Sequence, residues 1–243
     1  MNLVESEPKI AADAADFWSE SQNSAGVRDL SHWFGEGRWK DEDLWSRVGR
    51  LHSLMLDEAC AATGLVRPRD RMVEWGPGGG ANASVFCKSF QHFHGVDISQ
   101  ANLTECQRQL AVRGLNNFHP VHIDAAQPET CLNHIPRAVD FFMSTAVYQH
   151  FPGKDYGLRV TRLAYEMLNP SGLALIQTRY DDGSEQLKPK LGNYHQNALA
   201  FTSYRLEEFW AACEQIGFTV FRVTLDPSCH YAYYSLLKGN KNA

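Results

Sequence analysis

The chain has 243 residues, a formal net charge of −5 and a hydrophobic fraction of 44%, with aromatic residues at 12%. A chain of this length suits one large α/β domain, or a core with an appended cap, better than two full domains. The acidic balance provides no electrostatic footprint for nucleic acid or for an anionic membrane surface, so we expect neither as a partner.

The sequence also lacks the signals of a membrane or secreted protein. No window approaches the roughly 18 consecutive apolar residues of a membrane span. Residues 1–9 are acidic rather than basic and precede no apolar run, so no signal peptide is visible. The six cysteines form no C-x-x-C pair, which favours buried reduced thiols over a disulfide framework. We therefore expect a cytoplasmic protein.

Residues 1–67 are predicted to form a helical N-terminal cap. This segment is polar and rich in tryptophan, and apolar residues recur at helical spacing over residues 44–63, with Gly64 as the stop. After Pro68 the pattern changes to alternating strands and helices. We therefore place the start of a core, residues 68–243, at this point.

The core opens with five short apolar runs that have the length of buried strands. They span residues 71–75, 93–97, 118–124, 139–145 and 173–180. Such runs, joined by crossover helices, indicate a parallel sheet that is covered on both faces. After a helix at about 204–216, the runs 218–225 and 230–237 predict an antiparallel hairpin. The predicted fold class is α/β, with a doubly wound, mostly parallel seven-stranded sheet that ends in this hairpin.

A glycine-rich turn follows the first strand. Gly76, Gly78, Gly79 and Gly80 lie between that strand and a helical pattern over residues 81–90. Glycine adopts positive φ freely and lets another molecule touch the backbone. The turn therefore predicts a cofactor that lies across a βα turn, against a helix N-terminus. As written, the turn satisfies the G-x-G-x-x-[G/A] pattern of dinucleotide-binding proteins, with an acid ending the next strand.

Three further features distinguish this turn from a plain dinucleotide fingerprint. The turn comes late in the chain, Glu74 stands just before it, and the sheet is predicted to close with an antiparallel hairpin. Together with E-W-G-P-G-G-G and the later V-D-I-S, these features resemble the class I S-adenosylmethionine-dependent methyltransferases, over about residues 68–238. The resemblance implies a Rossmann-like methyltransferase fold and S-adenosylmethionine as the cofactor.

The resemblance also implies roles for several residues. Asp97 ends the second strand, where a carboxylate has two oxygens to accept both ribose hydroxyls, and Ile98 would pack on the adenine. Asp124, with Ala125 beside it, would meet the adenine amino group, although a helix N-cap is the alternative for Asp124. Glu74 would order the loop and hold the methionine end of the cofactor. Gly76 and Gly78 would approach the cofactor by their backbone, whereas Gly79 and Gly80 can serve the turn alone.

The fourth strand ends in S-T-A-V-Y-Q-H-F. Because ligands collect beyond the carboxyl ends of parallel strands, we expect Ser144 to border the cofactor and Tyr148 to contact the substrate. His150 is a candidate base for the proton of the methyl acceptor; the alternative is that it only packs in the loop. No N-P-P-Y follows this strand, which argues against relatives that methylate adenine or glutamine.

A long polar segment follows the fifth strand, and such loops are usually functional. Its candidate substrate contacts are Arg179, Tyr180 and Tyr194, and His195 is a second candidate base. Asp181 and Asp182 could hold a metal ion together with a histidine, but adjacent acids are more typical of solvated turns. We therefore expect no metal site.

Tryptophans in the predicted cap offer flat surfaces on which a sugar or an aromatic acceptor can stack. In the family that this chain resembles, helices before the core fold over the cofactor as a lid. Trp33 and Trp39 are candidate substrate contacts, and plain packing of the cap on the core is an equal alternative for both. Trp45 is expected to pack, and Arg38 is a candidate for binding an anionic group.

The sequence thus predicts an S-adenosylmethionine-dependent methyltransferase that moves a methyl group to an oxygen or nitrogen of a small polar molecule, such as a sugar or a natural product. Two rivals remain open: an NAD-dependent oxidoreductase, and a catalytically inactive methyltransferase-like binding subunit. A homodimer is compatible with the sequence, which identifies neither the acceptor nor the methylated atom.

Overall fold

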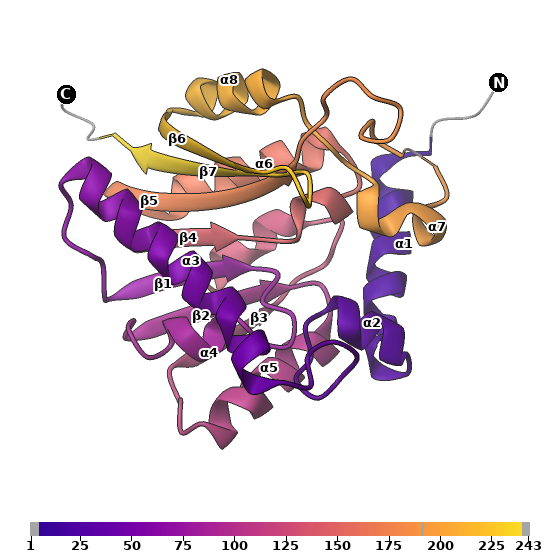
Figure 1. Ribbon diagram of the computed structural model, residues 1–243, viewed down its shortest axis with the longest axis horizontal. Helices are drawn as coiled ribbons and strands as arrows, with labels where there is room; N and C mark the ends of the chain where they lie inside the picture. Colours follow the sequence, from indigo (N-terminus) through magenta and orange to yellow (C-terminus); the bar gives the residue numbers. More distant parts are fainter. Residues whose placement is uncertain (1–4, 191, 240–243) are drawn as a thin grey trace.

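A computed structural model describes residues 5–190 and 192–239. Its centre is a seven-stranded sheet with the order β3-β2-β1-β4-β5-β7-β6 (Figure 1). The strands are β1 (Arg71–Trp75), β2 (His92–Asp97), β3 (Phe118–His122), β4 (Val139–Ser144), β5 (Leu168–Arg179), β6 (Phe218–Asp226) and β7 (Tyr231–Lys238).

The strand directions confirm the predicted fold class. β1 to β5 pair in parallel, whereas β7 lies antiparallel between β5 and β6. The strand order reverses beside β1, and the carboxyl ends of β1 and β4 flank that point. An open sheet of this kind binds ligands beyond the carboxyl ends of the strands at such a switch point.

Helices cover both faces of the sheet (Figure 1). One face packs on α3 (Glu42–Thr63), α4 (Ala83–Phe86) and α5 (Gln100–Val112). The other face packs on α6 (Lys154–Met167) and α8 (Leu206–Ile216). The alternation of strand side chains produces these two cores, because successive residues point to opposite faces: Val73 and Trp75 belong to one core, and Met72 belongs to the other.

The remaining helical turns lie around the carboxyl edge of the sheet or between its strands. They are α1 (Glu7–Ser19), η1 (Glu20–Gln22), α2 (Ala25–Leu30), η2 (Pro128–Asn133), η3 (Tyr148–His150), α7 (Tyr194–Asn197) and η4 (Ala198–Ala200). Figure 1 shows α1, α2 and α7 together beyond that edge. This placement brings α1 into contact with α7, although the two are far apart in the sequence.

The predicted division at residue 68 stays a prediction, and its two segments include residues outside the described ranges. Within the described part, α3 shares a core with the sheet through Leu56 and Ala59. By contrast, α1 and α2 lie at the carboxyl edge. A cap in the sense of a cover over the sheet edge is therefore formed by α1 and α2, whereas α3 is a layer of the core.

Two predicted boundaries differ from the structure. The helix expected over residues 81–90 is regular only over Ala83–Phe86. β5 begins at Leu168, whereas the sequence predicted a strand only from residue 173. Ser171 has φ +63° in the added part, and the register with β4 shifts after Val139. The first residues of β5 therefore form an irregular part of the strand.

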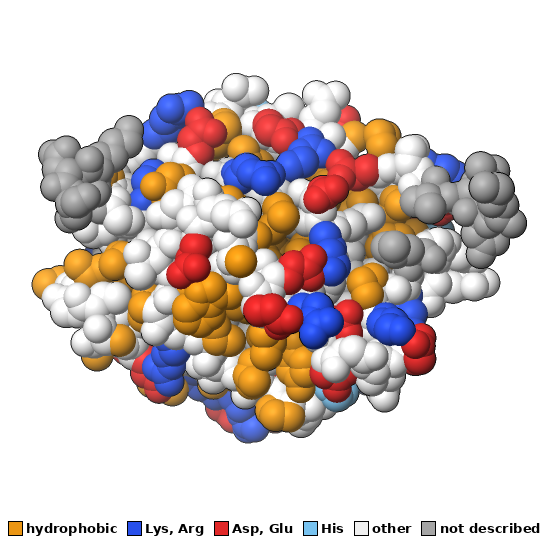
Figure 2. All heavy atoms as spheres, turned by 90° about the horizontal axis from the view of Figure 1, so that it is seen from above, with side chains coloured by type: hydrophobic (Ala, Val, Ile, Leu, Met, Phe, Trp, Pro, Cys, Tyr) orange, Lys and Arg blue, Asp and Glu red, His pale blue; other side chains and the backbone are white. Residues whose placement is uncertain are grey.

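The surface agrees with the composition. On the face shown in Figure 2, Lys and Arg side chains lie intermixed with Asp and Glu side chains. That face therefore offers no extended basic surface for a polyanion. Among residues 5–190 and 192–239, no helix has the length and apolar character needed to cross a membrane.

A glycine in α6 tests the packing between the helical layer and the sheet edge. A Cβ added at Gly157 would clash with the hydroxyl of Tyr204, a buried side chain that donates to the Lys154 carbonyl oxygen (3.0 Å). We expect Gly157→Ala to lower the free energy of unfolding by about 1–3 kcal/mol, the usual cost of overpacking, as measured by urea denaturation. Gly153→Ala is the matched control, because nothing lies within 4 Å of its added Cβ. Equal stability of the two variants would contradict the tight packing of Tyr204 on α6.

Candidate functional site

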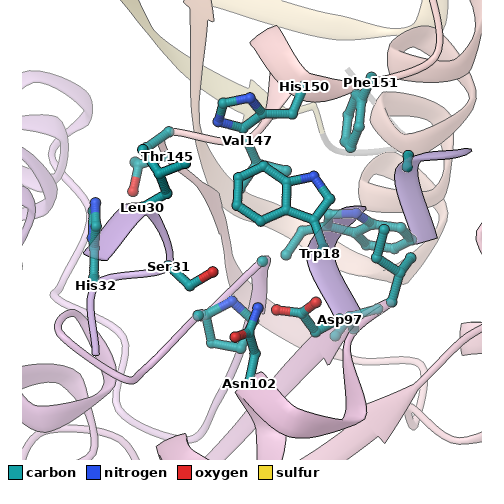
Figure 3. Close-up of a pocket in the computed structure, with 18 of the residues that line it drawn as sticks. Trp18, Leu30, Ser31, His32, Asp97, Asn102, Thr145, Val147, His150 and Phe151 are labelled. Carbon is teal, nitrogen blue, oxygen red and sulfur yellow. The ribbon is translucent and has the colours of Figure 1, made fainter. Parts of the chain in front are cut away.

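A pocket lies beyond the carboxyl ends of β1, β2 and β4 (Figure 3). About 850 Å³ of space lies between its walls, part of it open to solvent. Gly76 and Gly78 line it on the sheet side, and Trp18, Ser31 and His32 line it on the side of the N-terminal helices. Its position is the one predicted for the cofactor.

The glycine turn adopts a backbone that only glycine accommodates easily. Gly76 has φ +77°, and its N–H donates to the Val96 carbonyl oxygen (2.7 Å), which ties the turn to β2. Gly78 has φ +52°, and a Cβ there would clash with the carbonyl oxygen of Ser31. The turn is therefore shaped by two neighbours, one strand of the sheet and the segment after α2.

Asp97 lines the pocket at the end of β2. Its Oδ1 accepts the N–H of Ser99 (2.8 Å), and the Gly78 N–H and the Asn102 side chain also bond its carboxyl group. Burial nevertheless raises the pKa of Asp97 to about 6. A carboxylate held in a dry pocket gains from additional hydrogen-bond donors, so this geometry fits the hydroxyl groups of a ribose. Ile98 and Ala125, both predicted cofactor contacts, also line the pocket.

Glu74 lies one layer below the pocket, in a buried polar network. Asn82 lines the pocket and donates to Glu74 Oε1 (2.6 Å) and to Thr145 Oγ1 (3.2 Å). His52 of α3 donates from Nδ1 to the Asn82 side-chain oxygen (2.8 Å), because an amide oxygen can only accept. Glu74 Oε2 has no partner, and burial raises the pKa of Glu74 to about 8. The unpartnered oxygen is consistent with a cationic or donor group supplied by a ligand.

The structure does not bring Asp124 and Ser144 into the pocket lining. Asp124 is exposed, and its Oδ1 accepts the N–H of Ala126 (2.8 Å) in a turn before η2. Ser144 is fully buried and donates to the carbonyl oxygen of Trp75 (3.1 Å). A structural turn, close to the capping alternative for Asp124, therefore fits better than a contact with adenine. After Ser144 the strand ends, and the next three residues line the pocket instead.

His150 lines the pocket from η3. Its Nδ1 donates to the carbonyl oxygen of Ala198 (2.6 Å), and its ring meets Trp18 edge-on (4.8 Å between centroids; Figure 3). Burial lowers the pKa of His150 to about 4, so the ring is neutral at pH 7. Its Nε2 carries a lone pair, which accepts from Gln149 Nε2 (3.2 Å). His150 can therefore accept a proton, although a base with so low a pKa is weak.

His195, the second candidate base, lies away from the pocket. It is exposed in α7 and packs edge-on against Phe17 (5.8 Å between centroids). Tyr194, the residue before it, does line the pocket, and its hydroxyl donates to the His150 carbonyl oxygen (2.7 Å) and accepts from Trp18 Nε1 (3.0 Å). Tyr194 thus joins α1, α7 and η3 at one side of the pocket.

Three of the predicted substrate contacts lie in other surroundings. Tyr148 is buried in the core and shares a hydrogen bond with Thr161 (2.9 Å). Arg179 and Tyr180 stand at the end of β5, outside the pocket lining. Tyr180 forms a bridge to Tyr204. The predictions for Arg179 and Tyr180 therefore concern a region beside the pocket.

Both candidate tryptophans use their indole N–H groups within the fold. Trp33 Nε1 donates to the Asn102 side chain (2.9 Å), and Trp39 Nε1 donates to the carbonyl oxygen of Asp29 (2.6 Å). Trp39 is buried, and neither ring lines the pocket. The packing alternative therefore fits both residues better than a stacking surface for the substrate.

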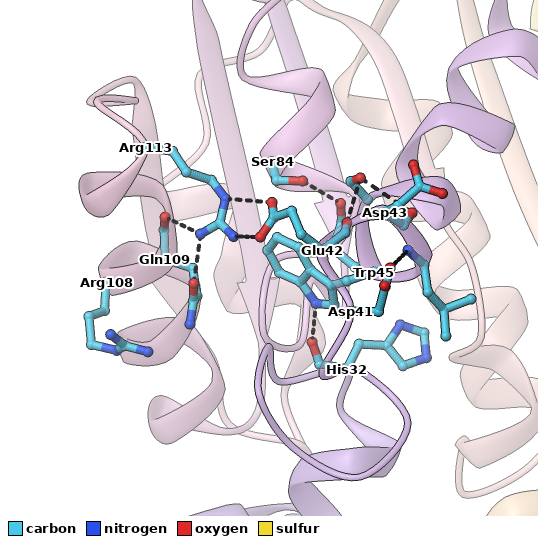
Figure 4. Close-up of polar contacts among 12 residues, drawn as sticks. His32, Asp41, Glu42, Asp43, Trp45, Ser84, Arg108, Gln109 and Arg113 are labelled. Atoms are coloured by element: carbon cyan, nitrogen blue, oxygen red, sulfur yellow. Dashed lines mark hydrogen bonds and ion pairs between the residues drawn. The ribbon is translucent and has the colours of Figure 1, made fainter.

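Packing between α3 and α5 holds the segment above the pocket in place (Figure 4). Trp45 Nε1 donates to the carbonyl oxygen of His32 (2.6 Å), as predicted for a packing tryptophan. The guanidinium group of Arg113 lies over the Trp45 ring (4.6 Å) and pairs with Glu42 (2.6 Å). The pocket-lining residue His32 is thus anchored through its backbone.

Several pocket residues were not predicted from the sequence. They are Trp18, Ser31, His32, Asn82 and Asn102. Asn82 carries a local signal, because it follows the glycine turn, but the others reach the pocket only through tertiary packing. Among the described residues, no three His, Cys, Asp or Glu side chains are grouped so as to hold a metal ion.

Comparisons with known proteins agree with this fold. Residues 73–174 match a family model described as a methyltransferase domain. A structure of Haemonchus contortus phosphoethanolamine N-methyltransferase 2, with phosphomonomethylethanolamine and S-adenosylhomocysteine, is similar with a TM-score of 0.63 and 16% identity, over 93% of this chain and 61% of that chain. An S-adenosylmethionine-dependent methyltransferase from Clostridium acetobutylicum ATCC 824 is similar with a TM-score of 0.61 and 15% identity, over 82% and 93% of the two chains. The [4+2]-cyclase SpnF shares the fold with a TM-score of 0.56 and 14% identity, over 76% and 80%. A search of curated proteins found no match.

The unpartnered carboxyl group of Glu74 predicts a pH-dependent stability. In the unfolded chain a glutamate has a pKa of about 4.3, whereas the folded chain holds its proton up to about pH 8. The folded state therefore binds more protons between these values, and its stability falls as the pH rises through this window, by at most about 1.4 kcal/mol per pH unit.

Glu74→Gln keeps an oxygen for Asn82 and removes the titration. We expect its stability relative to the wild type to increase steadily from pH 5 to pH 8, as measured by urea denaturation without ligand. The charge of Asp97 raises the pKa of Glu74, so the difference reports the titration of Glu74 together with its coupling to Asp97. A difference that stays constant with pH would show that Glu74 is ionised throughout.

Proposed function

We propose that this chain is a class I S-adenosylmethionine-dependent methyltransferase that moves a methyl group to an oxygen or nitrogen of a small polar molecule of the sugar or natural-product type; the methyltransferase-domain match and the similar structures support this. The observation that carries the proposal is the pairing of a positive-φ glycine turn with the buried Asp97 in one pocket. A turn of this kind accepts close contact by a ligand, and Asp97 offers its carboxylate to neighbouring hydroxyl groups.

The residues of the pocket divide into two groups, one expected to bind the cofactor and one expected to face the methyl acceptor. Asp97 and Ile98 would hold the ribose and adenine of S-adenosylmethionine, and Gly76 and Gly78 would contact it through their backbone. When bound, this cofactor supplies an electrophilic methyl group on a sulfonium. Glu74 supports the loop from below through Asn82.

The chain's contribution to methyl transfer is alignment first and proton acceptance second. Holding two reactants in line can account for roughly 7–11 kcal/mol of a barrier. Residues 145–147 and His150 line the pocket on the side of β4, where the acceptor would approach. His150 Nε2 is free of a proton at pH 7 and can take the proton of the acceptor, which contributes a smaller factor of about 10²–10⁴ when a base is used.

A small acceptor fits the enclosure of the pocket. Trp18, Ser31 and Tyr194 bring the N-terminal helices and α7 around it, which limits access by a large polymer. The related Haemonchus contortus structure holds a small acceptor, phosphomonomethylethanolamine. A cytoplasmic location and self-association into a homodimer stay predictions.

The two rival functions make different predictions about ligands. An NAD-dependent oxidoreductase would bind NAD in the same pocket, and a catalytically inactive subunit would bind S-adenosylmethionine without consuming it. The methyltransferase-domain match over residues 73–174 favours the methyltransferase over the oxidoreductase. The weak basicity of His150 is the observation that keeps an inactive subunit in consideration.

Substitution of Asp97 tests the cofactor assignment. We expect Asp97→Ala to weaken the binding of S-adenosylmethionine and S-adenosylhomocysteine by more than tenfold in isothermal titration calorimetry, because two ribose hydroxyls lose their acceptor. Asp124→Ala is the control, since this exposed acid makes only a local turn, and it should change affinity less than threefold. Unchanged affinity in Asp97→Ala, or binding of NAD in place of both ligands, would refute the assignment.

The two histidines provide a matched pair for the base. On any acceptor that the wild type methylates, we expect His150→Ala to lower kcat by about 10²-fold or more if the ring acts as a base. His195→Ala should leave kcat within about twofold, because His195 lies outside the pocket. Because the pKa of His150 is about 4, its ring stays deprotonated between pH 6 and 8. We therefore expect no change of kcat in this range from titration of His150. A rate in His150→Ala close to that of the wild type would leave alignment as the sole source of catalysis.

A further inference from the structure

The partly buried guanidinium of Arg179 stands at the end of β5, beside the pocket. Its Nη1 is shielded from solvent and has no hydrogen-bond partner among residues 5–190 and 192–239. Arg179 Nη2 donates to the carbonyl oxygen of Gln186 (3.0 Å). Burial lowers the pKa of Arg179, and the only charge that opposes this effect is that of Tyr231. Among the described residues, no carboxylate pairs with Arg179. A cation in this position loses solvation without compensation.

Gln177 connects this arginine to the pocket. Its Oε1 accepts the N–H of Ala146 (2.9 Å), and Ala146 lines the pocket. Its Nε2 is buried and has no partner. Because strand side chains alternate, Gln177 and Arg179 point to the same face of β5, the face that packs on α3. Two unpartnered donor groups therefore follow one another along the strand, leading away from the pocket wall.

Further polar groups surround the end of β5 on this face. Tyr231 of β7 pairs with Arg179 across the sheet. The charges of Arg38, in the segment that follows α2, and of Arg179 both lower the pKa of Tyr231 against the effect of burial. The Arg38 guanidinium lies over the Trp39 ring (5.0 Å to the ring centroid) and 3.4 Å from Asp29, and 55% of its side chain is exposed. Among the described residues, Arg179 is therefore the one of these two cations that lacks a carboxylate partner.

We propose that the methyl acceptor carries an anionic oxygen group, a carboxylate or a phosphate, and that Arg179 binds it, with Gln177 between this subsite and the cofactor pocket. Arg179 Nη1 and Gln177 Nε2, the two atoms without a partner among the described residues, are both hydrogen-bond donors. A ligand that binds them must therefore supply acceptors. A guanidinium presents its N–H groups in a fork that matches a carboxylate or a phosphate. This inference rests on the proposed function and specifies the class of its substrate.

The test uses matched ligand pairs with the S-adenosylhomocysteine-bound protein in calorimetry, and with S-adenosylmethionine in a mass-spectrometric assay for methyl transfer. The carboxylate arm compares glycine with glycinamide and 4-hydroxybenzoate with 4-hydroxybenzamide. The phosphate arm compares 4-hydroxyphenyl phosphate with hydroquinone. We expect the anionic member of at least one pair to bind at least tenfold more tightly, and the arm in which this occurs identifies the group. No preference for any anion in the wild type would overturn the proposal.

Arg179→Gln should abolish that preference, while S-adenosylhomocysteine affinity stays within twofold of the wild type. Arg222→Gln is the control: Arg222 lies on the edge strand β6 and already pairs with Glu58 (2.7 Å), and its removal should leave the preference intact. A preference that survives Arg179→Gln would overturn the proposal. If the wild type did not bind S-adenosylhomocysteine, this result would instead refute the proposed function.

The melting temperature without ligand separates a binding role of Arg179 from a structural one. If Arg179 serves to bind an anionic ligand, the Arg179→Gln variant should melt at or above the wild-type temperature, since the substitution removes an uncompensated cation. If Arg179 mainly holds the Gln186 carbonyl, the variant should melt several degrees lower, and the subsite assignment would be wrong. This readout does not depend on S-adenosylmethionine and remains decisive if the proposed function fails.

Discussion

The close approach between the glycine turn and the segment after α2 is the contact on which the pocket depends. Gly79 donates its N–H to the carbonyl oxygen of Ser31 (2.7 Å). A Cβ at Gly78 or Gly79 would run into the backbone of Ser31 to Trp33. Because both glycines lack a side chain, the N-terminal segment reaches the turn and covers the sheet edge, which turns an open strand terminus into an enclosed site. The same residues thus serve two needs, backbone conformation and close contact.

Uncompensated polar groups mark where ligands are expected around this enclosure. Glu74 and Asp97 are acids whose pKa values burial has raised, and they would gain from donors and positive charge. Arg179 and Gln177 each have a hydrogen-bond donor without a partner among the described residues, and acceptor groups or negative charge on a ligand would stabilise them. The pocket and the end of β5 therefore have opposite requirements, which a cofactor with hydroxyl and ammonium groups and an anionic acceptor would meet separately. Such groups reduce stability, as is common at functional sites.

Features encoded by local sequence were predictable, and features created by tertiary contact were not. Strand periodicity gave the sheet, and the glycine turn with Asp97 gave the cofactor pocket, because both signals lie within single βα units. Trp39 was ambiguous, since a tryptophan suits stacking and packing equally; its burial and its bond to the Asp29 carbonyl oxygen favour packing. Trp18 has no local signal at all; it reaches the pocket because α1 contacts α7 far along the chain. The Asp124 assignment followed the family pattern, whereas this chain uses that acid in an exposed turn.

The most direct test of this account is a crystal structure of the protein with S-adenosylhomocysteine. We predict both ribose hydroxyls on the carboxylate of Asp97, the amino-acid portion near the glycine turn above Glu74, and the sulfur directed toward residues 145–150. A ligand whose ribose contacts other residues, with Asp97 left bonded only to Ser99 and its neighbours, would contradict the account of the pocket.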